Sequence, residues 1–191
     1  AKNNLQDYRG AITDYTKAIE LNPTDYKAYY NRGLAKGISE YYKDAIYDFT
    51  KAIELNPKFA DAYYNRGLVY QALEKNDEAL ADFSKAVEQD PDYAPALFKK
   101  TEILQNLDRI DESLASAGVL VKNFPDSSAN WSLQGNIQMQ KSLWNESLAS
   151  YDRALALDKN SVETMINQGV VYQELDQLDL AEKMFQKALA S

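Results

Sequence analysis

Side chains that could carry out catalytic chemistry are scarce in this sequence of 191 residues. The chain contains neither His nor Cys, which excludes an imidazole base, a thiolate nucleophile and a Cys/His zinc site. The remaining candidates are two adjacent carboxylate pairs, Asp77/Glu78 and Asp111/Glu112. Both occur where one helix is expected to follow another, and negative charge is favoured at a helix N-terminus. No glycine-rich phosphate loop is present, because the glycines stand singly. We therefore expect no catalytic residue, cofactor or metal site, and no enzyme activity from this chain by itself.

Side chains suited to binding are more regular. The pair Tyr30-Asn31 recurs 34 residues later as Tyr64-Asn65. An Asn amide offers one acceptor and two donors, which match the N–H and C=O groups of an extended peptide. A neighbouring Tyr offers apolar area worth roughly 25 cal/mol per Å² when it is buried. This combination indicates recognition rather than reaction.

The same period of 34 residues organises the whole chain. It appears in the prolines Pro23, Pro57, Pro91 and Pro125, in the glycines Gly33, Gly67, Gly135 and Gly169, and in the aromatics Tyr15, Phe49, Phe83, Tyr151 and Phe185. A repeat of this length signals stacked units rather than one closed globule.

Each unit is predicted to contain two helices, such as residues 26–39 and 42–55. The second carries Ala45, Phe49 and Ala52, an apolar stripe at helical spacing. The Asn-Pro and Asp-Pro pairs should end this helix, because the residue before proline is disfavoured in the helical region. We expect the glycine and the first alanine to lie where the two helices cross, with a large aromatic filling the space.

This pattern resembles the tetratricopeptide repeat family over essentially the whole chain. The family's small residues, aromatic and terminal proline match Gly33, Ala45, Phe49, Ala52 and Pro57. The resemblance implies an all-α fold, a right-handed α-solenoid of stacked helix-turn-helix repeats. The family's usual leucine before the glycine is replaced here by Arg32, Arg66, Lys100, Gln134 and Gln168. We expect this departure to affect local packing only.

The period predicts a single array over 1–191. Residues 1–25 form the second helix of a truncated repeat, and the fuller repeats follow at 26–59, 60–93, 94–127, 128–161 and 162–191. The repeat 94–127 is the weakest and places Gly118 inside its second helix, so it is either a seam between two halves or an ordinary packed copy that has drifted. The chain starts in mid-repeat without Met, which suggests a fragment.

Both ends of the array are expected to be uncovered, because a repeat contacts only its neighbours. The side chains left without a neighbouring repeat are predicted to be Tyr8, Ala11, Tyr15 and Ile19 at the start, and Phe185 and Leu189 at the end.

The resemblance also implies a binding face. In such solenoids the first helices line the concave side, and asparagines matching Asn31, Asn65 and Asn167 often hold a partner's main chain. The predicted partner-binding residues are Tyr30, Asn31, Leu34, Tyr64, Asn65, Leu68, Phe98, Lys99, Asn136 and Asn167. The asparagines would bind main chain, the aromatic residues would bury side chains, and Lys99 would read an acidic residue. The alternative is that Asn is merely tolerated on an exposed helix and that the tyrosines stabilise neighbouring repeats. The carboxylate clamp of chaperone-binding members is disfavoured, because Asp61 and Asn65 stand where that clamp needs Lys and Arg.

We therefore expect a protein-interaction scaffold or adaptor that holds an extended segment of a partner. The alternatives are a scaffold that self-associates through its uncovered ends, and a region that positions substrates for a larger enzyme. The net charge of -8 argues against nucleic acid and anionic membranes as partners and gives a weak preference for basic ones. No apolar run approaches the ~20 residues of a membrane span. The compartment stays open, with the cytoplasm favoured.

Overall fold

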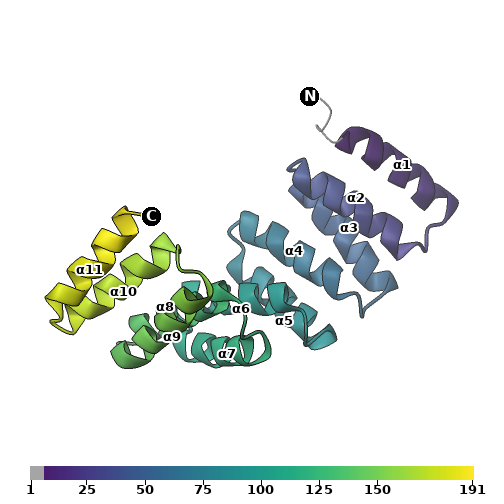
Figure 1. The fold of residues 1–191 in the computed structure, drawn as a ribbon. Helices are drawn as coiled ribbons and strands as arrows, with labels where there is room; N and C mark the ends of the chain where they lie inside the picture. The colour runs from purple at the N-terminus through teal and green to yellow at the C-terminus, as the bar shows by residue number, and fades with distance from the viewer. Residues whose placement is uncertain (1–6) are drawn as a thin grey trace. The chain divides into compact units, whose positions relative to one another are not determined.

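The computed structural model describes residues 7–191, and every regular element in that range is a helix. The helices are α1 (Tyr8–Leu21), α2 (Tyr26–Ile38), α3 (Tyr42–Leu55), α4 (Ala60–Ala72), α5 (Asn76–Gln89), α6 (Ala94–Asn106), α7 (Ile110–Asn123), α8 (Ser128–Gln140), α9 (Trp144–Leu157), α10 (Val162–Glu174) and α11 (Leu178–Leu189) (Figure 1). This confirms the all-α prediction. Residues 1–6 of the expected half repeat lie outside the described residues.

The chain forms two compact units, one ending at Ala96 and the other beginning at Leu97. The division falls in the first turn of α6, at the start of the weak repeat. In the first unit α2 packs against α1, α3 and α4, and α4 also packs against α3 and α5. In the second unit α8 contacts α7, α9 and α10, and α10 contacts α9 and α11. Each of these first helices therefore lies beside another first helix and between two second helices.

Glycines let the two helices of a repeat approach closely, as the sequence predicts. A Cβ added to Gly67 would lie 2.8 Å from the Phe83 ring, and one on Gly135 would lie 2.5 Å from the Tyr151 ring. Both rings are fully buried. Gly118 differs, because a Cβ there would meet nothing within 4 Å.

The turn between the two helices of each repeat has a left-handed residue that is not glycine. The φ angles at these positions are positive, at Glu40 (62°), Glu74 (58°), Asp108 (57°), Ser142 (58°) and Asp176 (56°). The next residue donates its N–H back into the first helix, as in the bond from Lys75 N to Tyr70 O at 2.9 Å. This is a Schellman ending, in which glycine is the usual left-handed residue. These turns were not predicted from the sequence, because glycine, the usual left-handed residue at such a position, is absent from all five.

The two ends differ in exposure. Leu189 is 89% exposed, as expected of an uncovered last helix, but Ile19 is only 9% exposed. Ile19 is buried because α1 packs against the following helix, α2.

Candidate functional site

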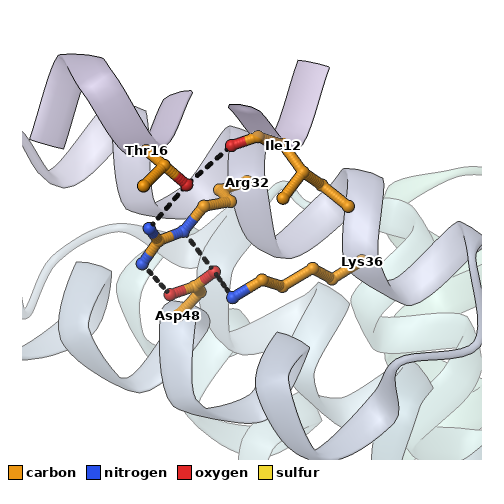
Figure 2. A network of polar contacts seen from close by, with 5 residues as sticks. All are labelled: Ile12, Thr16, Arg32, Lys36 and Asp48. Atoms are coloured by element: carbon orange, nitrogen blue, oxygen red, sulfur yellow. Dashed lines mark hydrogen bonds and ion pairs between the residues drawn. The ribbon is translucent and has the colours of Figure 1, made fainter. Parts of the chain in front are cut away.

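The first helices are held in place by a polar contact that recurs in successive repeats. In α2, Arg32 binds Asp48 of α3 with both sides of its guanidinium, Nε to Oδ2 at 2.9 Å and Nη2 to Oδ1 at 2.7 Å. Its third nitrogen, Nη1, donates to Thr16 Oγ1 of α1 at 3.1 Å, and Lys36 Nζ lies 2.8 Å from the same carboxylate (Figure 2). Arg32 of α2 thus forms hydrogen bonds to both neighbouring helices, α1 before it and α3 after it.

The same arrangement of arginine, aspartate and threonine occurs in the next repeat. Arg66 binds Asp82 through Nε and Nη2, each at 2.7 Å, and donates to Thr50 at 2.8 Å. The carboxylate side chains are 0% exposed for Asp48 and 7% for Asp82. A bidentate arginine–carboxylate pair of this kind is strong and geometrically specific. The hydrogen bond with Asp48 raises the pKa of the Arg32 guanidinium above its usual value. The arginines that replace the family's leucine therefore do more than adjust local packing.

Fixing these helices also fixes the residues beside the arginines, among them the predicted binding residues. In the first unit Leu34, Asn65 and Leu68 line a single pocket of about 210 Å³. Ile38 and Tyr42 complete its mainly apolar wall. Sequence reasoning missed these two, although their positions follow the same period.

Asn65 is oriented by two internal hydrogen bonds. Its Nδ2 donates to the Asp61 carbonyl at 2.8 Å and to the Tyr30 hydroxyl at 3.1 Å. Because a carbonyl oxygen only accepts, the amide nitrogen must face Asp61. The acceptor of the side chain, Oδ1, is therefore the part of Asn65 left for an incoming donor.

The two predicted tyrosines are largely engaged inside the array. The Tyr30 ring packs edge-on against Phe59 at 4.8 Å, and the Tyr64 ring lies 5.1 Å from Tyr93. Burial, and then the Asp61 carboxylate, raise the pKa of Tyr30 to about 12. These rings therefore pack the first helix of each repeat against the last residue of that repeat, just before the next first helix, and the Tyr30 hydroxyl also bonds to Asn65 of the next repeat. Asn31 follows Tyr30 on α2 and is half-buried.

In the second unit the predicted residues fall into two neighbouring cavities. Phe98 and Asn136 line one of about 460 Å³, and Asn136 and Asn167 line another of about 500 Å³. Asn136 Oδ1 accepts from Asn167 Nδ2 at 3.0 Å and from the Tyr151 hydroxyl at 2.7 Å. Lys99 forms a local ion pair with Glu102 at 2.7 Å, so its ammonium already has a carboxylate partner.

Two other kinds of site are absent from residues 7–191. No group of three or more His, Cys, Asp or Glu is placed to hold a metal ion there. Within the same range, no helix combines the length and apolar character needed to cross a membrane.

Helix pairs stacked on glycine–aromatic contacts define an α-solenoid of the helix-turn-helix repeat class. Sequence profiles described as "Tetratricopeptide repeat" match residues 60–93, 95–127 and 162–191, and one described as "TPR repeat" matches 3–37 and 40–74. The chain belongs to the tetratricopeptide repeat family. This membership supports a protein-interaction scaffold.

Solved structures agree on the fold. YrrB, described as a TPR protein with an unusual peptide-binding site, is 24% identical, with 92% of this chain and 91% of that one covered at a TM-score of 0.81. The MamA 41-end structure from Desulfovibrio magneticus RS-1 is 16% identical, with 86% and 93% covered and a TM-score of 0.81. The pilF structure from Pseudomonas aeruginosa is 18% identical, with 86% and 75% covered and a TM-score of 0.74. A comparison with curated protein sequences found no match.

Proposed function

We propose that the first helices of the repeats bind an extended segment of a partner protein, with the pocket of the first unit as one point of attachment. The observation that carries this proposal is that Leu34, Asn65 and Leu68 line one pocket. These residues come from two successive repeats, so a segment bound there would contact both.

Asn65 would recognise the partner's main chain. Its two amide hydrogens are used within the array, which leaves Oδ1 to accept one main-chain N–H. A net hydrogen bond of this kind contributes about 0.5–1.5 kcal/mol. Because Asn65 is held by Asp61 and Tyr30, it loses little rotamer freedom on binding.

The pocket itself would take an aliphatic side chain. Its walls are Leu34, Ile38, Tyr42 and Leu68, with Asn65 at one side. Full burial of a leucine-sized side chain contributes about 1.5–3 kcal/mol. A main-chain contact beside an apolar pocket therefore selects an extended segment with an aliphatic residue at one position.

Peptide display on the immobilised chain tests the proposal. Segments that are selected should bind about tenfold more weakly to Leu68→Gln, since a polar amide then faces the bound side chain. Leu73→Gln is the matched control, because Leu73 is an exposed leucine at the end of the same helix. Circular dichroism would verify that both variants stay helical. If selected segments bind Leu68→Gln, Asn65→Ala and the unaltered chain equally well, the pocket is not the site.

Self-association is the second candidate function, and the last helix favours it. Leu178 is 61% exposed and Leu189 is 89% exposed. Both line a hollow of about 440 Å³ that also includes Phe185. Exposed apolar patches often mark interaction sites. Sedimentation over a concentration range should show an oligomer that Leu189→Glu abolishes. A chain that stays monomeric throughout would exclude this candidate.

A further inference from the structure

The pocket of the first unit has a counterpart in the second unit, three repeat lengths further along the chain. The cavity of about 500 Å³ is lined by Gln105 and by five residues that have counterparts in the first pocket: Asn136, Gln140, Trp144, Asn167 and Glu174. Subtracting 102 from the numbers of these five gives Leu34, Ile38, Tyr42, Asn65 and Ala72, all of which line the first pocket. The two hollows therefore occupy the same place in the repeat.

The chemistry of the two hollows differs. An amide replaces Leu34 and another replaces Ile38, an indole replaces the phenol of Tyr42, and the carboxylate of Glu174 replaces Ala72. The asparagine is common to both, as Asn65 or Asn167, and Leu68 is matched by another aliphatic residue, Val170. Met139 and Val170 keep part of the second wall apolar, so a pocket suited to an aliphatic side chain has become one that combines apolar walls, a large aromatic ring and several polar groups.

Internal hydrogen bonds orient the amides of the second cavity. Asn167 Nδ2 donates to Asn136 Oδ1 at 3.0 Å, and Gln105 Nε2 donates to Gln140 Oε1 at 3.1 Å. The carbonyl oxygens of Asn167 and Gln105 are left as acceptors, and Glu174 lines the same cavity. No salt bridge to Glu174 is found among residues 7–191.

The surroundings carry negative charge. Neither Lys nor Arg lines this cavity or the neighbouring one of about 460 Å³, which shares Asn136. That neighbour is lined by Glu102, Asp158 and Glu163, of which Glu102 is paired with Lys99. Clefts lined by one sign of charge concentrate ligands of the opposite sign.

We propose that the cavity at Trp144 and Glu174 binds a basic side chain of the partner segment. Trp is the best aromatic partner for a cation, and a carboxylate with two amide oxygens supplies acceptors around it. Arginine fits better than lysine, because its planar guanidinium stacks on an aromatic face and presents five donors. This inference rests on the proposed function and adds to it a specific ligand class for the second unit.

The test uses the whole chain and blocked pentapeptides in which one variable residue stands between glycine pairs. The variable residue is arginine, lysine, leucine or glutamate. Binding is followed by NMR through the indole N–H signals of the two tryptophans. Trp144 lines the cavity, whereas the Trp131 indole N–H is held by the Pro125 carbonyl at 2.7 Å and serves as an internal reference.

The arginine peptide should shift the Trp144 signal saturably and leave Trp131 unchanged. Glu174→Gln should weaken that binding by about three- to fivefold, since one partly exposed ion pair is lost. The matched control is Asp126→Asn, which removes one exposed carboxylate from the loop at the opposite end of α8. It should change the binding by less than about twofold.

Two results would overturn the inference. One is an equal response of Trp144 to the leucine and arginine peptides, and the other is no response to any of them. Failure of the proposed function can be told apart from failure of this inference. The proposed function is tested separately, by peptide display and by the Leu68→Gln variant in the first unit. If Trp144 responds to arginine while no segment depends on Leu68, the basic cavity stands and the proposed groove function fails.

Discussion

The buried pair Arg66–Asp82 should make a large and strongly coupled contribution to the stability of the first unit. Asp82→Ala would remove the acceptor of two guanidinium N–H groups, each now 2.7 Å from a carboxylate oxygen. Arg66→Met would leave the Asp82 carboxylate, 7% exposed, without its cation. Breaking a buried pair from either side costs about 3–5 kcal/mol.

The double variant should cost much less than the sum of the single ones. With both charges gone, neither is left buried and unpaired, and the methionine keeps the apolar stem of the arginine in place. We expect the double variant to be destabilised by about as much as one single variant, which corresponds to a coupling energy of about 3–5 kcal/mol. The exposed pair Lys85–Glu88 provides a control, and Glu88→Ala should cost less than about 0.5 kcal/mol.

The assay is urea unfolding followed by two signals. Far-ultraviolet circular dichroism reports all the helices, whereas tryptophan fluorescence reports only the second unit, which contains Trp131 and Trp144, the chain's two tryptophans. A repeat array need not unfold in one step, so the two transitions are fitted separately. The Asp82 and Arg66 variants should shift the dichroism transition more than the fluorescence transition. Additive effects of the two substitutions would refute the reasoning, because they would mean that the charges do not depend on each other.

Three further predictions concern the backbone and one titrating group. Gly118→Ala should stabilise the chain by about 0.5–1 kcal/mol in urea unfolding, whereas Gly67→Ala should destabilise it by about 1–3 kcal/mol because its Cβ would lie 2.8 Å from a buried ring. Glu74→Gly should raise stability by about 0.5–1 kcal/mol, because the left-handed conformation at φ 58° suits glycine; no gain would argue against strain at this turn. Folding raises the pKa of Tyr30 from 10.0 to about 12, so the unfolded chain loses this proton first and stability should fall as pH rises through that interval. Tyr30→Phe should reduce that fall and the exposed Tyr41→Phe should not, as measured by unfolding at a series of pH values.

The helices were predictable because their signals are local and periodic. Proline and the apolar stripe mark α3, whose observed bounds Tyr42–Leu55 match the expected range 42–55. The close approach at Gly67 was also predictable, since a small residue and a large aromatic keep one spacing through the repeats. Such features depend on residue size, which the sequence displays directly.

The polar contacts were harder to predict. Arg32 and Asp48 are 16 residues apart, and so are Arg66 and Asp82, yet charged residues on a helix are usually assigned to its solvent-exposed face. Burial of a charge depends on a partner from another helix, which composition does not reveal. The recurrence of the same pair after 34 residues is the signal that could have identified it.

The candidate site was predictable in position more than in role. Leu34, Asn65 and Leu68 do share a pocket, but Tyr30 and Tyr64 mainly support the stacking of repeats. The side of the Tyr30 or Tyr64 ring that stays accessible depends on the residue just before the next helix, which is Phe59 or Tyr93. That contact joins residues about 29 positions apart, at the two ends of one repeat, and no local periodicity reveals it.

The polar contact beside the site persists in the last repeat even though its partner changes. Gln168 occupies the position that Arg66 occupies three repeats earlier, and the position matching Asp82 holds Met184. Gln168 Nε2 instead donates a hydrogen bond to Asp152 Oδ1, on the preceding helix α9, at 2.7 Å. That residue matches Thr50, the third partner of Arg66. Since either neighbouring helix can supply the acceptor, the first helix stays fixed while its contacts vary. The side chains on the first helices, Leu34 and Ala72 in one unit and Asn136 and Glu174 in the other, can then differ in chemistry without loss of position, and ligand choice would reside in them rather than in the fold.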